Sequence, residues 1–123
     1  CIGNAFTAEY ANLCGETKIM LSPVGEHWRN LERYFSNRVA NPLCSRCFLI
    51  AAYTPGMEEV FEKGKHLEWY TDKDNLLTLI AYYLEHADER ERIAKSGRRR
   101  VLRDMTFEKS AAHIIEECRV ARE

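Results

Sequence analysis

A short and nearly continuous apolar run at residues 47–52, CFLIAA, constrains the fold of this chain more than any other feature. Such a run is typical of a strand buried on both faces of a parallel sheet. A helical pattern precedes it. The segment that follows has Thr54 as a candidate N-cap and Pro55 at the first helical position, where a missing N–H costs nothing. The sequence therefore predicts a helix–strand–helix unit of an α/β fold.

Two further segments have the character of strands in the same sheet. Residues 18–23 (KIMLSP) precede the apolar run, and residues 66–70 (HLEWY) follow it and alternate in polarity. The predicted fold class is α/β, with a Rossmann-like parallel sheet of about three strands flanked by helices. Ligands of open α/β sheets bind outside the carboxyl ends of the strands. We therefore expect function at residues 53–57 and at the turn after the preceding strand.

The connection at residues 24–35 is long for an α/β unit, and such a length is uncommon without a functional role. It carries Trp28, which is equally compatible with packing on the domain and with stacking on a sugar or base. Ser36 is a candidate N-cap for the next helix, with Asn37 and Arg38 in its first turn. Backbone N–H groups at a helix N-terminus favour anions, and an arginine there can clamp a phosphate. This turn is the predicted phosphate site.

The C-terminal third of the sequence is predicted to be helical. Apolar residues between Leu76 and Leu84 recur at helical spacing behind a capping-box-like start at Thr71 and Asp74. A second helix is expected to open near Asp88, and a third at Thr106. The third should bury a stripe formed by Phe107, Ala111, Ile114, Ile115 and Cys118. The basic residues Arg98, Arg99, Arg100 and Arg103 are interpreted as a solvated helix face rather than a nucleic-acid surface.

Composition and cysteine spacing argue against several function classes. The chain has 18 basic and 19 acidic residues, and this balance predicts no general attraction to nucleic acid or to acidic membranes. No apolar run approaches the length of a membrane span. Five cysteines without a regular framework predict reduced thiols and a cytoplasmic location. Cys44 and Cys47 end a predicted helix and lack partners at matching spacing, so neither a redox pair nor a metal site is expected.

Residues 37–64, NRVANPLCSRCFLIAAYTPGMEEVFEKG, carry a resemblance to a known family. They are similar to the donor-binding core of glycosyltransferase-like proteins of the spore-coat-maturation type, which have the GT-B fold. The matching positions are Asn37, Arg38, Val39, Leu43, Phe48, Leu49 and Ile50 in a first block, and Tyr53, Pro55, Gly56, Met57, Glu58, Glu59 and Phe61 in a second. The likeness continues through residues 64–102 and covers most of the chain from Tyr10 onward.

The resemblance implies glycosyl transfer from a nucleotide-diphosphate sugar, with no covalently bound cofactor and no metal. It also implies that residues 1–123 are a single partial domain, the C-terminal donor-binding half of a GT-B enzyme. The active site would then need the missing N-terminal half, and this chain should not catalyse alone. The residues expected to bind the donor are Ser36, Asn37, Arg38, Asn41, Pro55 and Gly56.

Four positions depart from the family's pattern. Asn41 stands where a glutamate usually accepts hydrogen bonds from the ribose, and an amide brings no charge to that contact. Pro42 either kinks a helix begun at Ser36, by removing the bond to the Arg38 carbonyl, or opens a later helix that Asn41 caps. An arginine and a cysteine replace small glycines at residues 46–47.

Two other function classes remain as alternatives. A degenerate, non-catalytic binding or scaffold module would keep the fold, and Asn41 with Pro42 favours it. A flavodoxin-like signalling receiver would need acidic residues at its strand ends, and residues 18–23 and 47–54 contain none. Residues 18–23 carry one charge, so as an unpaired edge strand they predict self-association.

Overall fold

Three parallel strands form the sheet that organises the molecule. The computed structural model describes residues 8–34 and 37–121. Its strands are β1 (Met20–Ser22), β2 (Leu49–Ala52) and β3 (Glu68–Tyr70), in the spatial order β1-β2-β3. Met20 pairs with Leu49, and Ile50 pairs with Glu68. All three predicted strands are confirmed, each shorter than its predicted segment, and the apolar run supplies the central strand.

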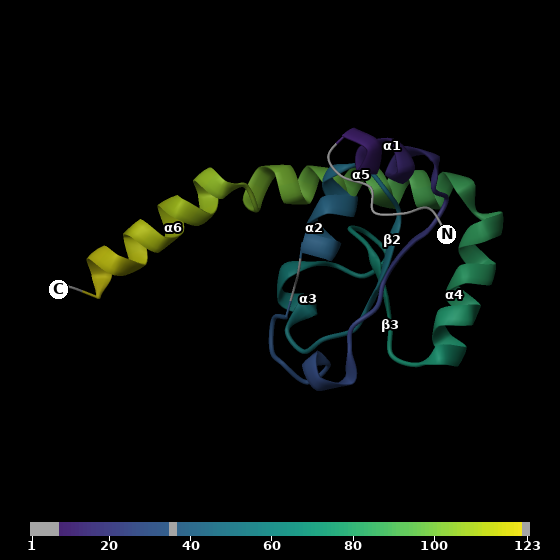
Figure 1. Cartoon of the computed structure of the whole chain (residues 1–123), viewed down its shortest axis with the longest axis horizontal. Coiled ribbons are helices and arrows are strands. Elements are labelled where there is room, and N and C mark those ends of the chain that lie inside the picture. Colours follow the sequence, from purple (N-terminus) through teal and green to yellow (C-terminus); the bar gives the residue numbers. More distant parts are fainter. Residues whose placement is uncertain (1–7, 35–36, 122–123) are drawn as a thin grey trace.

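Helices flank this sheet, as predicted. The described part of the chain contains the helices α1 (Ala8–Glu16), α2 (Asn37–Cys44), α3 (Met57–Val60), α4 (Lys73–Glu85), α5 (Ala87–Asp104) and α6 (Phe107–Val120), with a 3₁₀ turn, η1 (Glu26–Trp28), after β1. Of these, α6 extends away from the sheet (Figure 1). Figure 1 shows α4 on one side of the strands and α2 and α3 on the other, with α5 running across one end. No helix in residues 8–34 and 37–121 combines the length and the apolar character needed to cross a membrane.

The two faces of β2 carry separate cores, because successive side chains of a strand point to opposite faces. One core contains Leu49 and Ala51 together with Val39, Leu43, Met57, Phe61, Leu67 and Val101. The other contains Phe48 and Ile50 together with Tyr83, Ile93 and Ala94. The central strand is therefore buried on both faces, as its composition predicts.

Gly97 determines how closely α5 can approach the rest of the molecule. A Cβ atom at this position would lie 2.2 Å from the His66 carbonyl oxygen and 3.0 Å from Cδ2 of Leu43. The helix therefore packs directly on the backbone that leads into β3 and on the end of α2.

One carboxylate is buried at the edge of the sheet. Glu68 on β3 is 4 % exposed, and its Oε1 accepts a hydrogen bond of 2.8 Å from the Tyr83 hydroxyl. Lys63 Nζ lies 3.8 Å from its Oε2. Burial raises the pKa of Glu68 above its ordinary value, although the bond from Tyr83 and the charge of Lys63 act in the opposite direction.

The predicted start of α6 is confirmed, because the Thr106 hydroxyl accepts a hydrogen bond from the Lys109 N–H. The capping box predicted at Thr71 and Asp74 is wrong by one residue: Asp72 caps α4 by accepting a hydrogen bond of 2.8 Å from the Asn75 N–H. Pro42 lies inside α2, so the alternative in which it belongs to the helix that begins near residue 36 is the one observed. Ser36, the predicted cap of that helix, lies outside the described residues.

The predicted start of α3 is wrong. The helix begins at Met57 behind Gly56, rather than at Pro55 behind Thr54. Gly56 has a φ of 84°, a left-handed conformation that glycine adopts without steric cost. The Thr54 hydroxyl donates instead to the Tyr34 carbonyl, at 3.4 Å.

The predicted burial of the α6 stripe is also wrong. Phe107 is 96 % exposed, and Ile114 and Ile115 are more than half exposed. Figure 1 shows the reason: α6 continues outward from the end of α5 as an arm that leaves the body of the molecule. Its apolar side chains therefore have no packing surface within the described chain.

Candidate functional site

A crevice of about 400 Å³ lies at the carboxyl ends of β1 and β2. It is lined by Ser22, Pro23, Val24 and Gly25 from β1 and its turn, by Ala51, Ala52, Thr54 and Met57 from β2 and its turn, and by Trp28, Tyr34, Arg38 and Val39 from the connection and α2. The two turns that the sequence singles out therefore meet at one place. This edge of a parallel sheet is where ligands of α/β folds bind.

Small residues end both strands beneath this crevice. Ala51 and Ala52 close β2, and the buried Ser22 closes β1. Short side chains at these positions leave the hollow open down to the sheet, so that a ligand can approach the ends of the strands closely.

Two aromatic side chains form one wall of the crevice. The rings of Trp28 and Tyr34 are stacked, with centroids 5.5 Å apart and planes inclined by 12°. Trp28 remains 51 % exposed, so its indole can pack on the loop and still contact a ligand. Sequence reasoning missed Tyr34, although its place in an unusually long connection with Trp28 was an available signal.

Hydrogen bonds fix this connection to the turn after β2. The Arg33 N–H donates to the Pro55 carbonyl at 2.7 Å, next to the bond between Thr54 and Tyr34. A Cβ atom on Gly56 would lie 2.8 Å from Cγ of Arg33, so the two segments are in close contact. The aromatic wall is therefore held against the end of β2 by main-chain contacts.

Arg38 carries the only charge among the described residues that line the crevice. It lies in the first turn of α2, as predicted, although the helix start itself is only partly described. The two acidic residues of α3 have other partners. Tyr53 donates to Glu58 at 3.1 Å, which raises the pKa of Tyr53, and Glu59 pairs with Arg33. The described lining therefore contains one basic side chain and no acidic one.

The other predicted donor-binding residues are divided between two places. Pro55 and Gly56 lie in the turn that adjoins the crevice. Asn37 and Asn41, four residues apart and thus on one side of α2, line a separate groove of about 570 Å³ beside the junction of α5 and α6. The structure thus brings Arg38 to the strand ends but directs the two asparagines toward a different hollow.

Cys14, Cys44, Cys47 and Cys118 are free thiols in the described chain. Burial, together with the neighbouring thiol of Cys14, raises the pKa of Cys47 to about 12, so this thiol stays protonated at neutral pH. Within residues 8–34 and 37–121, no group of three or more His, Cys, Asp and Glu side chains is arranged to hold a metal ion.

Comparison with known proteins identifies the family of this chain. No curated protein matches the chain at a significant level. Residues 2–116, by contrast, match the family described as glycosyl transferase-like. Because this match covers nearly the whole sequence, the chain belongs to the glycosyl transferase-like family.

Proposed function

We propose that this chain is the donor-binding part of a nucleotide-sugar-dependent glycosyltransferase of the GT-B type, and that the crevice receives the nucleotide. The observation that carries the proposal is the composition of the crevice. A single arginine and a stacked aromatic pair converge at the carboxyl ends of two parallel strands, with no acidic side chain among the described lining residues.

The two parts of a nucleoside diphosphate match these features. A guanidinium can bind phosphate oxygens bidentately, and the N-terminus of a helix favours the same charge. The aromatic wall offers a flat apolar surface to a base or a sugar. When the bond between the sugar and the diphosphate breaks, Arg38 would stabilise the negative charge that develops on the leaving diphosphate. The glycosyl acceptor and the remaining catalytic groups would come from a second domain that faces this edge of the sheet.

Titration with uridine or guanosine diphosphate tests the proposal. Amide resonances of residues 22–28, 37–39 and 51–57 should shift together. Arg38→Gln should weaken binding by roughly tenfold, the effect of losing one charge-assisted hydrogen-bonding group. Arg29→Gln is the matched control, because Arg29 is exposed in the same connection and does not line the crevice. Shifts confined to α4, α5 and α6, no shift at millimolar ligand, or equal effects of the two substitutions would overturn it.

A second candidate is a non-catalytic binding or scaffold module that retains the fold. The position of Asn41 favours it, because this residue lines the groove beside α6 rather than the crevice with Arg38. If Asn41 contacts the ribose, as the family resemblance implies, Asn41→Ala should weaken nucleotide binding by roughly 1–3 kcal/mol and Asn41→Glu should strengthen it. Equal affinity of the native protein and both variants would show that Asn41 does not touch the ligand. Absence of nucleoside diphosphate binding in all three proteins would favour the scaffold module.

A further inference from the structure

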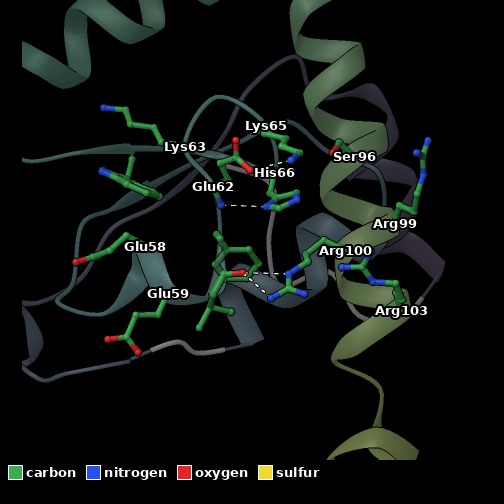
Figure 2. Close-up of a pocket in the computed structure, with 13 residues that line it drawn as sticks. Glu58, Glu59, Glu62, Lys63, Lys65, His66, Ser96, Arg99, Arg100 and Arg103 are labelled. Atoms are coloured by element: carbon green, nitrogen blue, oxygen red, sulfur yellow. Dashed lines mark hydrogen bonds and ion pairs between the residues drawn. The ribbon is translucent and has the colours of Figure 1, made fainter.

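A second hollow, of about 560 Å³, lies between α5 and the segment that joins α3 to β3. Its lining includes five permanent cations, Lys63, Lys65, Arg99, Arg100 and Arg103, and three carboxylates, Glu58, Glu59 and Glu62. Figure 2 shows Glu58 and Glu59 pointing away from α5, while the arginines arise from the helix on the opposite side. The α5 side of this hollow therefore carries three guanidinium groups, two of which, those of Arg100 and Arg103, pair with Asp104 on the same helix.

Hydrogen bonds give the hollow a fixed frame. Arg100 donates from Nε and Nη2 to the Val60 carbonyl, at 3.0 and 2.9 Å, and Arg92 donates to the Gly64 carbonyl at 3.3 Å. The direct contact of Gly97 with the His66 backbone holds the same segment against α5. Arg92 and Arg100 thus hold the segment between α3 and β3 against α5. Arg99 and Arg103, one turn apart on α5, also line the hollow. The exposed Arg99 side chain extends away from Lys65 and His66 (Figure 2), Arg103 pairs with Asp104 at 2.7 Å, and Lys65 donates to Glu62 at 2.8 Å.

The pKa of His66 reflects the charges that surround the hollow. Its Nδ1 accepts a hydrogen bond of 3.0 Å from the Glu62 N–H, so the neutral ring carries its proton on Nε2. Burial lowers the pKa of His66, and the charges of Lys65, Arg100 and Arg103 lower it further, against the opposing effect of Glu62. The imidazole is consequently a neutral donor in positive surroundings.

We propose that this hollow is a binding site for a phosphate group of a small anionic ligand, separate from the nucleotide crevice. A bound phosphate would compete with Asp104 for Arg103 and with Glu62 for Lys65, and Arg99 would reach it by rotation of its exposed side chain. The Nε2–H of His66 would supply a further donor. Ser96, which also lines the hollow, adds a hydroxyl. α3 separates the two sites: Met57 at its start lines the crevice, and Val60 at its end lines the hollow.

The test uses the intact protein with inorganic phosphate and pyrophosphate as probes, while the ring resonances of His66 are followed across a pH titration. A bound anion stabilises the imidazolium, so the pKa of His66 should rise as either probe saturates the site. Arg99→Gln with Arg103→Gln should weaken binding of the probes by roughly tenfold or more. The double variant keeps Arg100, which holds the frame, so folding is preserved. Arg119→Gln, on the exposed arm, is the control.

The outcomes separate this site from the nucleotide crevice. A nucleoside diphosphate that shifts the resonances of the crevice while inorganic phosphate shifts those of His66 and Ser96 would support both proposals. Phosphate that leaves the pKa of His66 unchanged at tens of millimolar would overturn this one alone. Equal loss of affinity in the double variant and in Arg119→Gln would also overturn it, since binding would then reflect the general charge of the protein.

Discussion

At the scale of single residues, Glu68 is the position where burial and ionisation conflict most directly. The folded protein retains its proton to a higher pH than the unfolded chain does, because burial raises its pKa. Between the pKa of Glu68 in the unfolded chain and its raised pKa in the folded protein, the folded state binds more protons than the unfolded state. The free energy of unfolding therefore falls as the pH rises through the raised pKa.

Glu68→Gln should remove this part of the pH dependence. The free energy of unfolding of the variant, minus that of the native protein, should increase as the pH rises from about 4.5 toward neutrality, because only the native protein must ionise a buried group. Chemical denaturation at a series of pH values measures the difference. Glu108→Gln, on the exposed arm, controls for the loss of one charge. A difference that stays constant with pH would contradict the prediction.

Gly97 gives a second prediction at this scale. Alanine is the better helix former, but a Cβ atom would collide with the His66 carbonyl oxygen, so Gly97→Ala should destabilise the fold by about 1–3 kcal/mol. Gly15→Ala in α1 is the matched control: nothing lies within 4 Å of its Cβ position, and it should be neutral or stabilising by up to about 1 kcal/mol. Thermal unfolding of both variants tests this, and a Gly97→Ala protein as stable as the native one would refute it.

At the scale of elements, sequence predicts what depends on neighbours along the chain. β2 follows from its apolar run, and the cap of α6 at Thr106 follows from local side-chain chemistry. The cap of α4 was predicted to within one residue, since Asp72 takes the place predicted for Thr71. The start of α3 could not be predicted, because the partner of Thr54 is Tyr34, twenty residues earlier. The sequence correctly predicted Arg38 in the first turn of a helix. It could not predict that Asn37 and Asn41 line a different groove from Arg38, because this depends on how α2 is rotated by its packing on α5.

The exposed stripe of α6 provides a prediction for this element. Amphipathic spacing shows that the helix has an apolar face, but it does not show what covers that face. Ile114→Ala should change the free energy of unfolding by less than about 0.5 kcal/mol, because the side chain is already exposed. Ile93→Ala, the same substitution in the core, should cost about 2–5 kcal/mol. Similar losses in both variants would mean that α6 is covered in solution.

At the scale of the whole molecule, apolar side chains remain exposed on several elements, including β1, α4 and α6. β1 lies at an edge of the described sheet with Leu21 44 % exposed, and α6 carries its open stripe. Edge strands and apolar patches of this kind promote association. The sequence-based expectation of self-association therefore stays a prediction, with the edge position of its strand now observed.

Light scattering across a dilution series should show a mass that falls as the protein is diluted. Leu21→Lys should shift the dissociation to higher concentration, because a charge on an edge strand opposes pairing and the exposed site tolerates it. If the protein associates through α6 instead of β1, Ile114→Lys, and not Leu21→Lys, should shift the dissociation to higher concentration. A stable monomer at high concentration would contradict the prediction.

The parallel pairing of β1 with β2 also affects how the molecule opens. Met20 reaches Leu49 only after the whole connection and α2 have been closed into a loop, whereas α4 and α5 contact each other across a single residue. Long-range closures of this kind form late and cost more chain entropy. We expect the amide hydrogens of β1 to exchange with solvent faster than those of α5. Because the crevice exists only while β1 is docked, any ligand bound there should slow exchange in β1 first.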